Sequence, residues 1–252
     1  MPEKDMRPSL IAGNWKMNGD MQSVIELVEG IKAGDAGKAQ LTVCPPSIFL
    51  MKVGGMLADS GVALGAQNVC DQASGAFTGE ISAEMLKQSG CRYAIVGHSE
   101  RRALYMESDE LVAARCAMAV ESGLTPILCV GETLQERDQG MTEQVVARQL
   151  DAVIGSKGMS VMAHAVIAYE PVWAIGTGKV ATPAQAQAVH AFIRGKLAAI
   201  DVSVADKIQI LYGGSMNPAN ASELLSQPDI DGGLIGGAAL KAADFLAIAQ
   251  SV

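Results

Sequence analysis

Short apolar segments alternate with longer amphipathic segments along the whole chain. Most of the short segments are apolar on both faces, which is typical of parallel strands that are covered on both sides. The eight predicted strands are Leu10–Ala12, Leu41–Cys44, Val62–Ala66, Tyr93–Gly97, Thr125–Val130, Ala165–Tyr169, Ile208–Tyr212 and Gly233–Ile235. They recur roughly every 30 residues, which is the length of one strand–helix unit. The pattern therefore predicts an α/β fold.

The segments between the predicted strands carry a helical period. The clearest predicted helices are Met21–Ala33, Ser108–Ser122, Glu143–Val153 and Pro183–Ala199. Ser108 is a good N-cap, and Thr182 followed by Pro183 supplies a cap and then proline at the first helical position. No linker rich in proline, glycine and serine interrupts the rhythm, so we predict that residues 1–252 form one domain. Periodicity alone allows either a closed (β/α)₈ barrel or an open, doubly wound sheet.

The composition favours a globular, acidic protein. Hydrophobic residues make up 49% of the chain and charged residues 18%, so a large core can form and disorder is not expected. The net charge of -8 repels polyphosphate backbones, and we therefore predict no nucleic-acid partner. An anionic ligand would have to be held by a local site of positive charge.

Cysteine usage and the absence of long apolar runs predict a cytoplasmic enzyme. The five cysteines are odd in number and form no CxxC pair, and their spacing with the three histidines gives no metal-ligand cluster. The start of the chain is charged and leads into no apolar signal region. No apolar run approaches the ~18 residues that span a membrane. We expect a reduced, cytoplasmic protein with no metal and no membrane partner.

Polar residues that could carry chemistry follow the predicted strands rather than precede them. They are Asn14 and Lys16 after the first strand, His98 after the fourth, Glu170 after the sixth, Ser215 after the seventh, and Gly236 and Gly237 after the eighth. In a parallel barrel the carboxyl ends of the strands meet at one rim, where the active sites of such barrels lie. Any one of them could be an ordinary polar loop residue. The whole set at one rim favours a catalytic site.

Five longer motifs resemble the triosephosphate isomerase family. They are Gly13–Asn18 (GNWKMN), Gly97–Arg102 (GHSERR), Ala168–Lys179 (AYEPVWAIGTGK), Tyr212–Ser215 (YGGS) and Gly232–Gly237 (GGLIGG). The resemblance implies a single-domain TIM barrel and an aldose–ketose isomerase of glycolysis and gluconeogenesis. Such an enzyme interconverts dihydroxyacetone phosphate and D-glyceraldehyde 3-phosphate through an enediolate. It implies no cofactor, because backbone N–H dipoles and a lysine supply the positive field that the phosphate needs.

The resemblance also implies catalytic roles. Glu170 matches the carboxylate base that removes a carbon-bound proton. His98 matches the electrophile that donates to the enediolate oxygen, and the short helix predicted directly after it favours a neutral imidazole. Lys16 matches the source of positive charge, Asn14 a neighbouring donor, and Glu100 a carboxylate with an assisting role.

Taken alone, these residue types have plain structural explanations. A glutamate at a strand end and a lysine in a loop are commonly solvated. A single histidine is more often structural, and we expect that of His164 and His190. Pro171 argues against chance at Glu170, because it fixes the chain direction immediately after the base.

Glycines and one serine are predicted to bind the phosphate of the substrate. Backbone N–H groups approach a phosphate closely only where no side chain intervenes, which fits Gly176, Gly236 and Gly237. Ser215 follows two glycines and adds a hydroxyl donor. Turn formation explains the same glycines and is compatible with phosphate binding. By the resemblance, Asn14 and Lys16 complete this set.

The stretch Pro171–Lys179 matches the lid of the family. Trp173 is predicted to be exposed in it, which a static surface does not favour. Gly176 and Gly178 leave backbone freedom near its far end. Closure of the lid would exclude water and keep the enediolate from losing phosphate in a side reaction.

Three other functions compete with this interpretation. Gly176–Ala181 fits a loose GxGxxA nucleotide motif, and Asp201 lies about 20 residues further on, but no second strand precedes that aspartate. A Schiff-base aldolase needs a buried lysine, and no predicted strand contains one. A non-catalytic barrel that binds sugar phosphates would explain the glycines but would leave Glu170 and His98 without a purpose.

The segment Gln67–Glu80 is long for a connection between barrel elements and carries Phe77 near its tip. In the family, the matching loop docks into the partner subunit beside the first-strand loop, here Asn14–Met17. We therefore predict a homodimer that forms through Gln67–Glu80. A flexible surface loop is the alternative, and it would not favour an exposed phenylalanine.

The chain departs from the family pattern at Ala239, where the family commonly has serine. A serine hydroxyl could make hydrogen bonds behind the phosphate-binding glycines, and an alanine cannot. We expect a looser phosphate loop and a modestly less stable protein. The substitution is neutral if water or a neighbouring group takes over the missing bond.

Overall fold

A closed barrel of eight parallel strands forms the centre of the molecule in the computed structural model, which describes residues 7–177 and 179–252. Each strand pairs with the next, and β8 pairs with β1. The strands are β1 (Leu10–Asn14), β2 (Gln40–Cys44), β3 (Val62–Ala66), β4 (Cys91–Val96), β5 (Thr125–Val130), β6 (Val166–Tyr169), β7 (Ile210–Tyr212) and β8 (Gly232–Ile235). The predicted single-domain (β/α)₈ barrel is confirmed, and closure excludes the open, doubly wound sheet.

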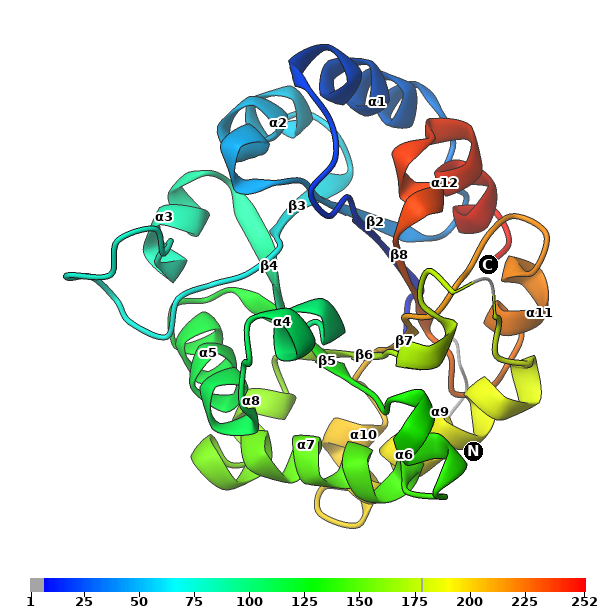
Figure 1. The fold of residues 1–252 in the computed structure, drawn as a ribbon. Helices are drawn as coiled ribbons and strands as arrows, with labels where there is room; N and C mark the ends of the chain where they lie inside the picture. Colours follow the sequence, from blue (N-terminus) through cyan, green and yellow to red (C-terminus); the bar gives the residue numbers. More distant parts are fainter. Residues whose placement is uncertain (1–6, 178) are drawn as a thin grey trace.

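Helices surround the barrel in a ring (Figure 1). They are α1 (Met21–Ala33), α2 (Leu50–Leu57), α3 (Ala83–Gln88), α4 (Ser99–Leu104), α5 (Asp109–Glu121), α6 (Leu134–Asp138), α7 (Thr142–Lys157), α8 (Met159–Met162), α9 (Pro183–Ala198), α10 (Val202–Ala205), α11 (Ala221–Leu225) and α12 (Ala242–Ala249), with 3₁₀ turns η2 (Ser47–Phe49), η3 (Val172–Ala174) and η4 (Gly237–Leu240). The predicted caps form, because Ser108 accepts from the Leu111 N–H and Thr182 caps α9 ahead of Pro183. Among the described helices, none is long and apolar enough to cross a membrane.

The predicted strand boundaries differ slightly from those observed. The strand expected at Tyr93–Gly97 begins earlier, at Cys91, and ends at Val96. Gly97 has a φ of 70°, so it turns the chain out of β4 toward His98. The strand expected at Ile208–Tyr212 begins later, at Ile210.

Apolar side chains fill two layers. Alternate strand residues, among them Tyr93 and Ile95, form a cluster inside the barrel, and the residues between them pack outward against the helices. Closure of the barrel requires glycine at Gly232, which has a φ of 146°. A Cβ there would lie 1.9 Å from the carbonyl oxygen of Leu10, directly in the β1–β8 pairing.

The barrel has two rims, which we name by the strand ends that form them. At the amino-terminal rim, a buried ion network joins the chain before β1 to the start of β8. Arg7 Nε lies 2.8 Å and Arg194 Nη2 lies 2.6 Å from the carboxylate of Asp231. Asp231 also accepts the Ile210 N–H at 2.9 Å. Buried charges are costly unless they are paired, so this network holds the first and last strands together.

Candidate active site

A cavity of about 400 Å³ opens at the carboxyl-terminal rim. Eight of the nine predicted site residues line it, namely Asn14, Lys16, His98, Glu170, Gly176, Ser215, Gly236 and Gly237. They lie at or after the ends of β1, β4, β6, β7 and β8. Glu100 is not part of the cavity wall. It lies at the edge, where its Oε1 contacts Lys16 Nζ at 2.5 Å.

Lys16 is held in a strained backbone conformation. Its φ of 51° lies in the left-handed region, which residues with a side chain rarely adopt. The Lys16 N–H donates to Asn14 Oδ1 at 3.0 Å, and its carbonyl accepts from Gln67 Nε2 at 2.8 Å. The side-chain amides of Asn14 and Gln67 thus hold the Lys16 backbone in place, and Glu100 pairs with its ammonium group.

Glu170 lies buried between β6 and the start of α4, with 2% of its surface exposed. Its Oε2 accepts the Ser99 N–H at 2.8 Å, and its Oε1 lies 2.9 Å from His98 Nε2. Two glycines make room for it. A Cβ at Gly131 would lie 1.8 Å from the Glu170 carbonyl oxygen, and one at Gly213 would lie 2.9 Å from its Cγ.

The pKa of Glu170 lies below its ordinary value. Burial acts to raise this pKa, but the facing His98, the Ser99 N–H and Lys16 together outweigh burial. The carboxylate is therefore ionised at neutral pH and is able to accept a proton.

His98 is the N-cap of α4, as the predicted short helix implied. Its Nδ1 accepts the Glu100 N–H at 3.2 Å, so this nitrogen carries no proton and the ring proton lies on Nε2, toward Glu170. Burial lowers the pKa of His98, whereas the carboxylates of Glu170 and Glu100 raise it, and the net pKa is above the ordinary value. The sequence-based expectation considered only the helix, and the facing carboxylate acts in the opposite direction.

Comparison with known proteins gives the family of the chain. The family model described as triosephosphate isomerase matches residues 9–252. A protein named triosephosphate isomerase from Thiobacillus denitrificans is 59% identical over 98% of this chain and 99% of its own length. Proteins of the same name from Dechloromonas aromatica and Halorhodospira halophila are 58% and 59% identical, over 98% and 96% of this chain and 99% and 97% of their own lengths.

The chain belongs to the triosephosphate isomerase family. The family that the motifs indicated is thereby confirmed, together with its isomerase class and its barrel. Two of the rival functions also find no support in the geometry. Asp201 caps α10 through the Val204 N–H at 3.1 Å and follows no second strand. None of the eight described strands contains a lysine for a Schiff base.

Sequence reasoning missed residues that contact the predicted lid stretch and the candidate base. Glu132, fully buried after β5, accepts the Tyr169 hydroxyl at 3.1 Å and Trp173 Nε1 at 2.9 Å. Arg137 lies 4.4 Å above the Trp173 ring. The expected exposure of Trp173 is therefore wrong, because a buried carboxylate holds it. Glu132 and Ser99 lie within three residues of the ends of β5 and β4, as His98 does, so the rule that selected His98 would have found them.

The predicted phosphate-binding residues differ in how free their donors are. A Cβ at Gly237 would meet nothing within 4 Å and one at Gly236 only the Lys16 side chain, so these glycines face the open cavity. The Ser215 N–H and hydroxyl both donate to the Ala174 carbonyl, at 3.2 and 2.8 Å. Ser215 is therefore tied to η3. Gly178, expected to loosen the lid, lies outside the described residues.

The described residues contain no group of three or more histidine, cysteine, aspartate or glutamate side chains that could hold a metal ion. Lys16 brings positive charge to the cavity, and Asn14, His98 and the glycine backbone bring hydrogen-bond donors.

Proposed function

We propose that this chain interconverts dihydroxyacetone phosphate and D-glyceraldehyde 3-phosphate by proton transfer through an enediolate, with Glu170 as the base. One observation carries the proposal. An ionised, buried carboxylate lies 2.9 Å from a histidine N–H, in a cavity that also holds a lysine. Base, hydrogen-bond donor and positive charge are the three groups that an enediolate requires.

Each catalytic group has a distinct task in this proposal. Glu170 removes the carbon-bound proton and returns it to the neighbouring carbon. The Nε2–H of His98 and the amide of Asn14 donate to the oxygens that become negative. Lys16 stabilises the added charge, and Glu100 positions Lys16 through the contact at 2.5 Å.

We assign the phosphate of the substrate to the backbone of Gly176, Gly236 and Gly237, with Ser215 as a further donor and Lys16 and Asn14 nearby. The lid, residues 171–179, then closes over the cavity. Ser215 connects the two events, because its N–H and hydroxyl are bound to Ala174 within η3 of that stretch. A phosphate that accepts from Ser215 therefore breaks or re-forms the hydrogen bond between Ser215 and the Ala174 carbonyl of the lid.

The test is a coupled spectrophotometric isomerase assay of Glu170→Gln beside the wild type. We expect kcat to fall by about 10²–10⁴-fold, the usual effect of removing a general base, while the circular dichroism spectrum and melting temperature stay unchanged. Glu143→Gln makes the same chemical change on the exposed surface of α7 and should leave kcat unaltered. A Glu170→Gln enzyme with near-wild-type turnover would refute the assignment.

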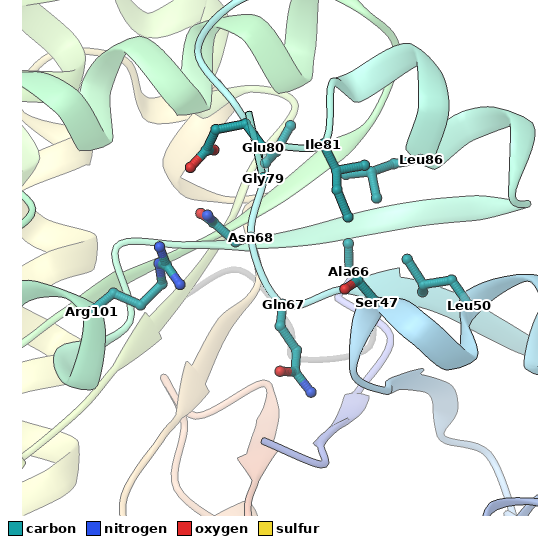
Figure 2. Close-up of a pocket in the computed structure, with 11 residues that line it drawn as sticks. Ser47, Leu50, Ala66, Gln67, Asn68, Gly79, Glu80, Ile81, Leu86 and Arg101 are labelled. Carbon is teal, nitrogen blue, oxygen red and sulfur yellow. The ribbon is translucent and has the colours of Figure 1, made fainter. Parts of the chain in front are cut away.

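We further propose a homodimer that forms through the loop Gln67–Glu80. In Figure 1 the connection between β3 and α3 extends away from the barrel. Figure 2 shows Gln67, Glu80 and Arg101 around a cavity of about 230 Å³ at its base. Phe77 is exposed in the loop itself. Other large apolar side chains are exposed next to Lys16, which Gln67 contacts, or within five residues of residues that line this cavity, namely Met17, Ile48, Met51, Met85, Leu104, Tyr105 and Met106. Such exposure marks an interaction surface.

Light scattering tests the dimer. We expect twice the 26.2 kDa mass of one chain at micromolar concentration. Phe77→Asp, which places a charge at the loop tip, should shift the population toward monomer, and Ile200→Asp, an equivalent change on an exposed residue elsewhere, should not. A monomer mass for the wild type would disprove the dimer.

We propose that residues 1–252 work as one catalytic domain in the cytoplasm, without a nucleic-acid or membrane partner. All five cysteines are free and buried, which fits a reducing compartment. The net charge of -8 opposes binding to polyanions.

A further inference from the structure

A second large cavity lies at the amino-terminal rim, opposite the catalytic one. It measures about 520 Å³ and is bordered by the starts of β4, β5 and β6 and by the residues just before β7. Arg92 and Lys207 line it, and no aspartate or glutamate is among the described residues of its wall. We infer that this cavity is a second binding site, for a small organic anion that carries two or more carboxylate or phosphoryl groups.

The two cations of this cavity have no counter-charge. Within the described chain, neither Arg92 nor Lys207 forms an ion pair or a side-chain hydrogen bond. Arg92 is instead stacked on Tyr93, with its guanidinium carbon 5.5 Å from the ring centroid. A guanidinium presents a planar fork of donors that matches a carboxylate or a phosphoryl group. An anion in the cavity would neutralise two positive charges that line the same wall.

Tyr93 adds a hydrogen-bond donor to the wall of the cavity. The side chain lines the cavity and is only 4% exposed, yet its hydroxyl has no hydrogen-bond partner among the described residues. The hydroxyl is not among the described polar atoms that are both fully buried and unpaired, so it is open to the cavity and free to donate to a ligand oxygen. Burial raises the pKa of Tyr93, so the hydroxyl keeps its proton and acts as a donor at neutral pH.

The remaining wall indicates the kind of anion. Val166, Val204 and Ile208 provide apolar surface, and Gln40 and Ser203 provide neutral polar groups. The volume exceeds the roughly 400 Å³ of the catalytic cavity. A short carbon skeleton with charged ends therefore fits better than a single inorganic ion. The rim does not need these cations for stability, because its structural arginines are paired with Asp229 and Asp231.

Isothermal titration calorimetry of the intact protein at low ionic strength tests the site, with citrate as the carboxylate probe and inorganic pyrophosphate as the phosphoryl probe. Three variants separate the possible sites. Arg92→Gln/Lys207→Gln removes the proposed cations. Lys16→Met removes the cation of the catalytic cavity. Lys38→Gln/Lys52→Gln removes two exposed charges that do not line the second cavity.

We expect at least one probe to bind the wild type, and Arg92→Gln/Lys207→Gln to weaken that binding about tenfold or more, as loss of charge-assisted hydrogen bonds does. Lys16→Met and Lys38→Gln/Lys52→Gln should keep it. Tyr93→Phe should weaken it less. Binding that survives in Arg92→Gln/Lys207→Gln, or that disappears in Lys16→Met, or absence of binding for both probes, would overturn the proposal. Because the titration requires no turnover, its failure is distinct from a failure of the isomerase assignment.

Discussion

Glu170 and Asp231 are both buried carboxylates beside strand ends, but they lie at opposite rims of the barrel. Asp231 is held by two guanidinium groups and a backbone N–H, so its acceptor positions are occupied by charged and fixed donors. Glu170 is held by Ser99 and by the single ring proton of His98, and it borders an open cavity.

The difference between these two environments separates stability from chemistry. A carboxylate between two arginines is fully compensated, and exchanging those partners for a substrate would leave buried charges unpaired. A carboxylate held by a backbone N–H and an imidazole, with no guanidinium partner, can exchange one donor for a proton at smaller cost. The partners of a buried acid, rather than its burial, therefore indicate whether it acts as a base or as an anchor.

Among the substitutions that test this comparison, Asp231→Asn should have the largest effect on stability. The substitution keeps the size of the side chain but leaves the buried Arg7 and Arg194 without their shared counter-charge. We expect the free energy of unfolding in urea to fall by about 3–5 kcal/mol. The kcat of the folded enzyme should remain unchanged, in contrast to Glu170→Gln.

Asp151→Asn is the matched control, because its partner Lys196 is only partly buried and the aspartate is 57% exposed. Loss of such a pair changes stability by roughly 0–1 kcal/mol. Equal destabilisation by the two substitutions would show that the buried network at the amino-terminal rim has no special role.

The two buried histidines also differ in their surroundings, and the difference should appear in how stability depends on pH. His98 faces carboxylates, whereas His190 Nδ1 bonds a backbone carbonyl, and burial lowers the pKa of His190 to about 4. An unfolded histidine takes up a proton near pH 6.5, which folded His190 does not. As the pH falls from 6.5 to 4, the folded state should therefore lose about 3 kcal/mol from this group. In His190→Asn, the free energy of unfolding in urea should fall less steeply with pH over this range than in the wild type. An unchanged slope would contradict the assignment.

A smaller effect is expected from Ser99→Ala at the carboxyl-terminal rim. The Ser99 hydroxyl donates to Glu170 Oε1 at 3.3 Å, while the N–H of the same residue is retained in the variant. Loss of one donor to a carboxylate should reduce kcat/KM by about tenfold. The acid limb of the pH–rate profile should move to higher pH, because removal of a donor raises the pKa of Glu170. The control Ser122→Ala, at the end of α5, should alter neither kcat/KM nor the pH–rate profile. An unchanged pH–rate profile in Ser99→Ala would argue against a role of the Ser99 hydroxyl at Glu170.

The smallest effect is expected at Ala239. This residue is fully buried in η4, its N–H donates to Gly236, and a Cβ on Gly13 would lie 3.1 Å from its methyl group. In Ala239→Ser, a hydroxyl could back-bond to the Gly236 carbonyl within the same turn. We expect a gain of about 0.5–1.5 kcal/mol in unfolding free energy and tighter binding of a phosphorylated enediolate mimic. If neither the melting temperature nor that affinity rises, the expectation of a looser loop is wrong.

Local patterns in the sequence determined the helices and strands and the rim of the barrel at which the candidate catalytic residues lie. The helix predicted at Met21–Ala33 has those bounds in the structure, because capping and the apolar stripe are decided within a few residues. Glu170 and His98 could be selected because the end of a strand is a local feature. The family motifs could be identified from the sequence for the same reason, since each is a continuous run of residues.

Only the tertiary structure decided which groups meet. Arg7 and Asp231 are 224 positions apart, and nothing local to either residue indicates the other. The hold of Ser99 on Glu170, the contact of Glu132 with Trp173 and the unpaired cations of the second cavity arise in the same way. Because electrostatic interaction depends on distance in space and on burial, the direction of the His98 pKa shift followed from the facing carboxylate and not from its own helix.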